Sequence, residues 1–143
     1  MIKKGIILAG GTGSRLSPLT KVSNKQLLPL YDKPLIFYPL SVLMLAGIRN
    51  ILIIVNKNQK ENFQNILGNG KTLGLTITYK EQNKPKGLPE AFLIGESFIQ
   101  DDNVALILGD NFFYGQGFTK RLAQIIKKNS GATIFAYNVK NPK

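Results

Sequence analysis

The sequence has 143 residues, 43% of them hydrophobic, and its 19 Lys and Arg outnumber 8 Asp and Glu, for a formal net charge of +11 at pH 7. The absence of His and Cys excludes disulfides, thiol nucleophiles, zinc sites built on these residues and Ser-His-Asp triads. The length and apolar content suffice for one domain with a buried core, whose chemistry must come from carboxylates, cations, amides, hydroxyls or a hard metal ion.

Five short apolar runs predict β-strands, at 5–9, 51–55, 75–79, 104–108 and 132–137. Four of them alternate little between polar and apolar residues, which is typical of strands buried on both faces of a parallel sheet. The run 75–79 does alternate, so we expect it to have one wet face or to lie near an edge.

Helix-like segments separate these runs, at 35–46, 58–67, 89–98 and 119–128. The first is apolar nearly all round, carries Pro39 in its first turn and ends at Gly47, a favourable C-terminal cap. Alternating strands and helices predict an α/β fold, a doubly wound and mostly parallel sheet with flanking helices. No internal repeat or interdomain linker interrupts the chain.

No segment reads as a targeting or membrane signal. Lys3 and Lys4 precede an apolar run that is shorter than the ~7 residues of a signal-peptide core. The longest apolar stretch, 35–48, is interrupted by Pro39 and Ser41 and is too short for the ~20 residues that span a bilayer. We therefore expect a soluble cytoplasmic protein without membrane contacts.

The positive charge indicates a polyanionic partner: nucleic acid, an anionic membrane or a small ligand such as a nucleotide. The lysines are scattered along the chain and do not form a block or alternate with aromatic residues, as they do in many nucleic-acid-binding surfaces. This scatter disfavours nucleic acid as the partner.

The segment after the first predicted strand, LAGGTGSRLSPLT at 8–20, is the most informative part of the sequence. It follows the carboxyl end of a strand, where open α/β sheets bind ligands. Gly10, Gly11 and Gly13 allow positive φ and close approach, so backbone N–H groups can point at phosphate oxygens. Arg15 adds a planar fork for phosphate. These features favour a phosphate-binding loop over a plain glycine turn.

Two common phosphate-binding motifs do not match this loop. No Gly-Lys-Ser or Gly-Lys-Thr occurs, which excludes a Walker A motif, and Leu16 stands where the dinucleotide-binding pattern needs its third glycine.

A more specific resemblance emerges from segments spread along the chain: LAGGTGSRL (8–16) with Pro18 and Thr20, KQLLP (25–29), DKP (32–34), LAGIR (45–49), AFLIG (91–95) and LGDNFFYG (108–115). In this order they resemble the sugar-1-phosphate nucleotidyltransferases, and most closely the members that transfer a thymidylyl group. The resemblance covers all 143 residues.

The resemblance implies that a phosphate oxygen of glucose 1-phosphate attacks the α-phosphorus of dTTP, giving dTDP-glucose and pyrophosphate for dTDP-rhamnose-type and cell-surface polysaccharide biosynthesis. The nucleophile is already anionic, so positioning and charge neutralisation suffice without a general base. A uridylyltransferase of the same family and a non-catalytic nucleotide-binding module are the alternatives.

By the same resemblance, Arg15 and Lys25 are the expected catalytic residues. Arg15 would pair with the leaving pyrophosphate, and Lys25 would lie between the two reacting phosphates. Asp110 would bind Mg²⁺, the expected cofactor, together with substrate phosphates. Without the resemblance, Lys25 would read as a solvated cation and Asp110 as a turn or cap residue.

The resemblance also assigns nucleotide contacts to Leu8, Gly10, Gly11, Thr12, Gly13, Ser14, Gln26, Gln82, Gly87 and Asn111. The amide of Gln82 offers a donor beside an acceptor, which complements the O4 and N3–H edge of thymine or uracil. Gln82 therefore disfavours purines and leaves UTP open.

Chains of this family are about twice as long, and their second half carries a further metal-binding Asp, a Glu-Lys pair for the sugar phosphate and the helices of a homotetramer. Residues 1–143 are thus expected to be the nucleotide-binding part, truncated at the C-terminal side of the sheet and lacking the sugar-binding and oligomerisation half. We expect this chain to bind nucleotide with little or no turnover.

Overall fold

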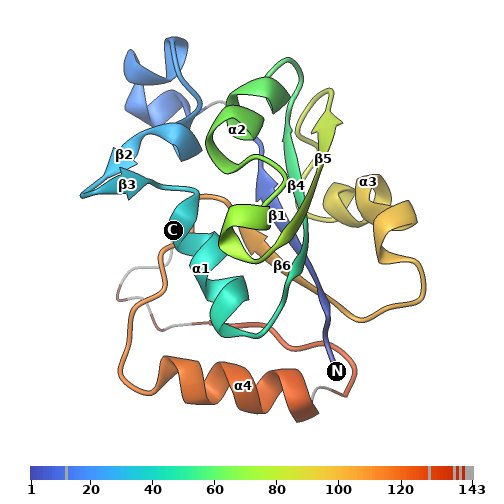
Figure 1. Ribbon diagram of the computed structural model, residues 1–143. Helices are drawn as coiled ribbons and strands as arrows, with labels where there is room; N and C mark the ends of the chain where they lie inside the picture. The colour runs from blue at the N-terminus through green and yellow to red at the C-terminus, as the bar shows by residue number, and fades with distance from the viewer. Residues whose placement is uncertain (12, 129, 137, 139, 141–143) are drawn as a thin grey trace.

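The computed structural model describes residues 1–11, 13–128, 130–136, 138 and 140. Its centre is a parallel sheet in the order β5-β4-β1-β6, shown in Figure 1. The four strands are β1 (Lys4–Ala9), β4 (Asn50–Asn56), β5 (Thr76–Gln82) and β6 (Val104–Leu108). All three pairings are parallel, so the predicted strands at 5–9, 51–55, 75–79 and 104–108 are confirmed.

In the described part of the chain, four α-helices flank this sheet: α1 (Phe37–Leu45), α2 (Lys60–Leu67), α3 (Glu90–Ile99) and α4 (Phe118–Lys128). The larger apolar cluster joins side chains of α1, α2 and α4 to one face of the sheet. The smaller cluster joins α3 to the other face, and Figure 1 shows α3 apart from the other helices. The predicted doubly wound α/β fold is confirmed.

The two central strands send successive side chains to opposite faces. Ile7 and Ile53 enter the larger cluster, whereas Ile6, Leu52 and Ile54 enter the smaller one, and all five are fully buried. Burial of each such side chain contributes about 1.5–3 kcal/mol. The continuous apolar runs in the sequence are therefore explained by a sheet that is covered on both faces.

The alternating run forms the edge strand β5. Thr76 and Thr78 are exposed while Ile77 is buried, and β4 is the only strand paired with β5 among the described residues. The expectation of a wet face or an edge position for 75–79 is correct on both counts.

The fifth predicted strand, 132–137, is wrong for the residues that can be judged. Residues 132–136 form no strand, and Tyr137 lies outside the described residues. Within the described part of the chain β6 pairs only with β1, so residues 132–136 do not extend the sheet from its open edge. Instead, the Phe135 ring packs against Phe113 and Phe118, each at 6.2 Å between centroids.

The connection from β1 to α1 is built of short elements: the 3₁₀ turns η1 (Ser14–Leu16), η2 (Leu19–Lys21) and η3 (Lys25–Leu27), then a small antiparallel hairpin of β2 (Pro29–Leu30) and β3 (Lys33–Pro34). A further turn, η4 (Lys71–Leu73), precedes β5. In η3 the Asn24 side chain accepts a hydrogen bond of 2.9 Å from the Gln26 N–H. This N-terminal cap holds the backbone of η3, from which the side chains of Lys25 and Gln26 extend.

Within the described ranges, no helix combines the length and the apolar character needed to cross a membrane.

Candidate functional site

The candidate site lies where the strand order reverses. From β1 the chain moves to β4 and β5 on one side, and then crosses the sheet to β6 on the other side of β1. The carboxyl ends of β1 and β6 therefore meet at the kind of position where open α/β sheets bind ligands. A pocket of about 270 Å³ opens there, lined by Gly10, Gly11, Gly13, Ser14, Arg15, Leu16, Lys25, Gln26 and Asp110.

The glycine loop adopts the backbone conformations that its composition predicts. Gly11 has φ of 105° and Gly13 has φ of 59°, values that side chains with a Cβ rarely adopt. The Gly13 carbonyl accepts from the Leu16 N–H at 2.9 Å and from Thr20 Oγ1 at 3.0 Å, which closes the loop onto the next turn. Thr12 lies outside the described residues.

Close packing also explains the glycine at position 10 and at position 109. A Cβ on Gly10 would overlap the amide of Gln82, and a Cβ on Gly109 would lie 2.9 Å from Gln26 Cγ and 3.0 Å from Ala9 Cα. Gly10 thus packs against the end of β5, and Gly109 packs against Gln26 and the end of β1, without room for a side chain at either position. The Gly109 N–H donates to the Leu8 carbonyl at 2.9 Å, which joins the segment after β6 to β1.

Side-chain amides hold the first two glycines of the loop. Asn56 Nδ2 donates to the Gly11 carbonyl at 2.8 Å, and the Gly11 N–H donates to Asn56 Oδ1 at 3.2 Å. Gln26 Nε2 donates to the Gly10 carbonyl at 3.3 Å. These hydrogen bonds fix the backbone at Gly10 and Gly11.

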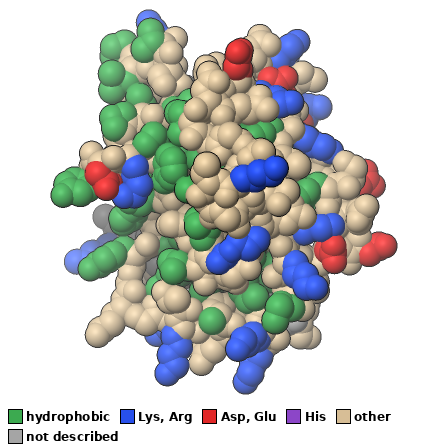
Figure 2. All heavy atoms as spheres, viewed as in Figure 1, with side chains coloured by type: hydrophobic (Ala, Val, Ile, Leu, Met, Phe, Trp, Pro, Cys, Tyr) green, Lys and Arg blue, Asp and Glu red, His purple; other side chains and the backbone are tan. Residues whose placement is uncertain are grey.

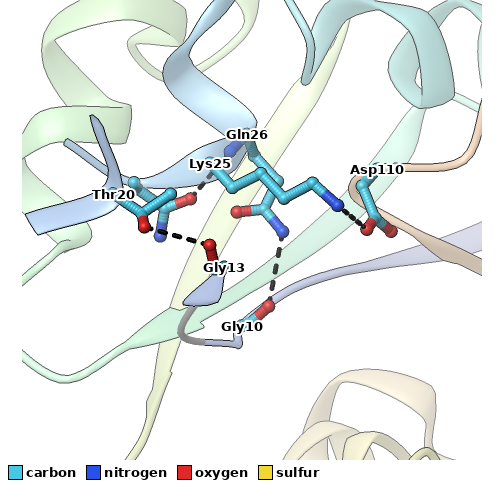
Figure 3. A network of polar contacts seen from close by, with 7 residues as sticks. Gly10, Gly13, Thr20, Lys25, Gln26 and Asp110 are labelled. Carbon is cyan, nitrogen blue, oxygen red and sulfur yellow. Dashed lines mark hydrogen bonds and ion pairs between the residues drawn. The ribbon is translucent and has the colours of Figure 1, made fainter. Parts of the chain in front are cut away.

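All three charged residues predicted for the site line the pocket, and two of them, Lys25 and Asp110, form an ion pair there. Lys25 Nζ lies 2.7 Å from Asp110 Oδ2, and Figure 3 shows the two side chains pointing toward one another, with the Gln26 amide directed at Gly10. About one third of each charged side chain is exposed, so an incoming ligand can reach both. A cation, a carboxylate and a loop of backbone N–H groups together suit a phosphate ligand with a metal ion.

Comparison with known proteins now decides the family. The sequence profile described as nucleotidyl transferase matches residues 4–143. This chain belongs to the nucleotidyl transferase family. The resemblance inferred from the glycine loop and the later segments is thereby confirmed.

Within the nucleotidyl transferase family, the chain is similar to proteins named glucose-1-phosphate thymidylyltransferase. It is 59% identical over 140 residues to that of Neisseria meningitidis, covering 98% of this chain and 49% of the relative. It is 52% identical over 139 residues to that of Mycobacterium tuberculosis, covering 97% and 48%. The chain thus spans about half the length of the curated relatives it matches.

Two solved structures share the fold. A Bacillus anthracis protein solved with a sucrose, described as a candidate glucose-1-phosphate thymidylyltransferase, superposes with a TM-score of 0.82 at 39% identity over 90% of this chain and 52% of that one. A UDP-glucose pyrophosphorylase complexed with UDP-glucose gives 0.72 at 32% identity over 89% and 53%.

The other nucleotide contacts expected from the family lie around the pocket rather than in its lining. The Leu8 side chain packs in the α3 cluster, and Gln82 is only 4% exposed at the end of β5. Gly87 is exposed in the loop after β5 with φ of 97°. Asn111 is half-buried, and its N–H donates to the Leu108 carbonyl. The structure thus gathers the phosphate-loop residues with Lys25, Gln26 and Asp110.

One buried atom in the site has no partner. Gln26 is 3% exposed, and its Oε1 is the only buried side-chain oxygen or nitrogen among the described residues without a hydrogen bond. Since its Nε2 donates to the Gly10 carbonyl, the free atom is an acceptor. A ligand hydroxyl or N–H at this wall of the pocket would satisfy it.

Asn56 is the main residue that the sequence interpretation missed. It is the last residue of β4 and directly follows an apolar run, where a single polar residue looks like the start of a turn. The signal that could have found it is its position at the carboxyl end of a buried strand, the same edge as the glycine loop.

On the face of the molecule in Figure 2, the described basic side chains do not form a single stripe. Figure 2 shows Lys and Arg side chains spread over the visible face from top to bottom, with hydrophobic side chains gathered at the upper left. Exposed apolar residues of the connection between β1 and α1 are Leu16, Leu19, Val22, Leu30 and Tyr31.

Proposed function

We propose that residues 1–143 form the nucleotide-binding part of a cytoplasmic enzyme that transfers dTMP from dTTP to glucose 1-phosphate, giving dTDP-glucose for nucleotide-sugar biosynthesis. The observation that carries this proposal is the Lys25–Asp110 ion pair beside the glycine-loop pocket. The names of the relatives at 52–59% identity support thymidylyl transfer. The half of the relatives outside the match is the proposed location of most sugar-phosphate contacts and of the oligomer interface.

The proposed reaction needs no histidine or cysteine. A phosphate oxygen of the sugar bonds to the α-phosphorus, the bond from that phosphorus to the bridging oxygen breaks, and pyrophosphate leaves with the electron pair. Because the attacking oxygen is anionic, no proton has to be removed, and the protein has to position two polyanions and neutralise their charge. The cations at the pocket, Arg15 and Lys25, suit that task.

Each charged residue has a separate role in this proposal. Arg15 pairs with the terminal phosphates, and Lys25 moves from Asp110 toward the phosphates that react. The N–H groups of the glycine loop, apart from that of Gly11, which donates to Asn56 Oδ1, contact phosphate oxygens. Gln26 Oε1, which lacks a partner, accepts a hydrogen bond from the nucleotide, and Gln82 and Gly87 recognise the base.

Asp110 fits a magnesium ion only together with the nucleotide. The described residues contain no group of three His, Cys, Asp or Glu that could hold a metal ion. Mg²⁺ commonly uses one or two carboxylates and completes its coordination with substrate phosphates and water. Asp110 would hold it in that way, and its charge would offset that of the phosphate oxygens.

Uridylyl transfer is the second candidate, favoured by the structural similarity to UDP-glucose pyrophosphorylase. Uracil and thymine present the same O4 and N3–H edge to Gln82. That neighbour is 32% identical to this chain, compared with 52–59% for the relatives named thymidylyltransferase. Uridylyl transfer is therefore the second candidate.

The decisive experiment measures binding and turnover side by side. Calorimetric titrations with dTTP, UTP, ATP and GTP in Mg²⁺ are combined with a pyrophosphate assay after addition of glucose 1-phosphate. We expect dTTP to bind most tightly, UTP next and the purine nucleotides poorly, with little pyrophosphate released by this chain alone. Failure to bind any of the four nucleotides would refute the proposal.

Binding to nucleic acid is tested in the same samples. A basic protein that binds DNA or RNA through phosphates loses affinity steeply as salt rises and shows no preference among nucleotides. We expect a preference among nucleotides to persist as salt increases.

A further inference from the structure

Asn56 contacts both hydrogen-bonding groups of one loop residue. Its Nδ2 donates to the Gly11 carbonyl at 2.8 Å, and its Oδ1 accepts from the Gly11 N–H at 3.2 Å. Rotating this amide by 180° would place nitrogen against N–H and oxygen against carbonyl. The Gly11 backbone therefore selects one orientation of the Asn56 side chain.

The orientation of Asn56 in turn selects that of Gln82. Gln82 Nε2 donates to Asn56 Oδ1 at 3.1 Å, so the reversed Gln82 amide would place two oxygens against each other. Gln82 is 4% exposed, and its amide lies against Gly10, where a Cβ would overlap it. Side-chain rearrangement there is restricted, because buried polar groups must keep their partners.

We propose that Asn56 is a positioning residue: it is oriented by the Gly11 backbone, and it in turn holds the Gln82 amide in one orientation. That orientation makes the site select thymine over cytosine. This inference rests on the proposed function, in which Gln82 recognises the base. Asn56 itself does not touch the base. It links the loop that would hold the phosphates to the amide that would recognise the pyrimidine.

The chemistry of the two pyrimidines explains the selection. With one Nε2 hydrogen directed at Asn56, Gln82 keeps a second N–H and the Oε1 acceptor, which match the O4 acceptor and N3–H donor of thymine. Cytosine presents an amino donor and an N3 acceptor at the same positions. Cytosine would match only the reversed Gln82 amide. Asn56 Oδ1 disfavours that orientation, because it would face the Gln82 oxygen instead of Nε2.

Two substitutions separate this role from simple support of the loop. Asn56→Ala removes the acceptor that orients Gln82, so the ratio of dTTP to dCTP affinity should fall about tenfold, alongside weaker dTTP binding. Asn56→Asp keeps an acceptor for Gln82 Nε2 but faces the Gly11 carbonyl with oxygen and adds negative charge. It should weaken both nucleotides and leave their affinity ratio within about threefold of the wild type.

The experiment is calorimetric titration of the 143-residue chain with dTTP and dCTP in Mg²⁺. Asn65→Ala is the matched control, since Asn65 is an exposed amide on α2 and its loss should change neither affinity. Thermal unfolding followed by circular dichroism verifies that each variant is folded. If Asn56→Ala does not fold, Asn56→Leu replaces it, because leucine has a similar shape and lacks the hydrogen-bonding groups.

The outcomes distinguish this inference from the proposed function. A lower dTTP affinity with an unchanged dTTP to dCTP ratio in Asn56→Ala overturns the inference, since Asn56 would then support only the loop. Unchanged affinities, or a wild type without preference for dTTP over dCTP, also overturn it. If the wild type binds neither nucleotide, the proposed function fails and the inference fails with it.

Discussion

Lys25 Nζ lies 2.7 Å from Asp110 Oδ2, although the two residues are 85 positions apart in the sequence. Lys25 belongs to the turn η3, and Asp110 follows β6; the parallel pairing of β1 with β6 brings their loops together. With about one third of each side chain exposed, such a pair contributes only about 0–1 kcal/mol to stability. The ion pair contributes little to folding stability and lies at a pocket suited to phosphate. We therefore expect it to act in ligand binding.

Replacing Lys25 tests this role. Lys25→Met should leave the free energy of unfolding in urea within about 1 kcal/mol of the wild type and weaken dTTP binding about tenfold or more, because a hydrogen bond to a charged group is lost. Calorimetry measures the affinity. Lys60→Met on the exposed start of α2 is the matched control and should bind dTTP normally. Unchanged binding by Lys25→Met would show that Lys25 does not contact the nucleotide.

Asp110 should account for the dependence of nucleotide binding on metal. We expect Mg²⁺ to strengthen dTTP binding by the wild type, and Asp110→Asn to reduce that enhancement about tenfold, since the neutral amide is a weaker ligand for a hard cation. In EDTA the variant should bind dTTP at least as well as the wild type, because a negative charge beside the phosphates is gone. Titrations in Mg²⁺ and in EDTA check both points. An undiminished effect of Mg²⁺ in the variant would remove Asp110 from the metal site.

The glycine at position 10 should be necessary for folding stability. Gly10→Ala introduces a Cβ that overlaps the Gln82 amide, which should lower the free energy of unfolding by about 1–3 kcal/mol. Gly115→Ala is the control, because no atom lies within 4 Å of a Cβ built there, and it should change stability by less than about 0.5 kcal/mol. Urea denaturation of both variants measures the difference. Equal stabilities would mean that Gln82 moves aside without cost.

Tyr79 should contribute stability that disappears at high pH. Its hydroxyl donates to the Gly68 carbonyl at 2.7 Å, and burial raises the pKa of Tyr79 to about 12. Since the folded-state pKa lies above the ordinary value of 10.0, the contribution is complete below pH 10 and is lost as the pH rises through 12. Tyr79→Phe should be about 1 kcal/mol less stable at pH 7, and the difference should shrink between pH 10 and 12.

Unfolding curves of the wild type and Tyr79→Phe, recorded at each pH, give the difference in free energy of unfolding. The lysines are the same in both proteins, so their titration does not affect this difference. A stability difference that stays constant from pH 7 to 12 would contradict the raised pKa of Tyr79.

Much of the fold was predictable because its signals are local. Strands 51–55 and 104–108 were recognised from continuous apolar runs, and the glycine loop from three glycines after a strand. The run 132–137 has similar composition, yet residues 132–136 form no strand. A strand depends on backbone hydrogen bonds to a neighbouring strand, and composition does not report whether those bonds form.

The site was predictable only in part, for a related reason. Lys25 and Asp110 were proposed from their motifs, and the structure brings the two side chains together. Asn56 lies in no recognised motif and contacts Gly11, 45 residues earlier. The position of Gln82 under Gly10 was likewise not evident, because it depends on how the side chains at the ends of β4, β5 and β1 pack together.

The sequence by itself determined the class of chemistry and the fold class. Without His or Cys, and with a net charge of +11, the chain is suited to binding and neutralising polyanions, and its periodicity specifies strands and helices through local burial. The tertiary structure decided which of those residues meet. Parallel pairing of β1 with β4 and β6 brings Asn56 to Gly11 and Asp110 to Lys25, because contacts between distant segments depend on strand order and packing, which no local pattern encodes.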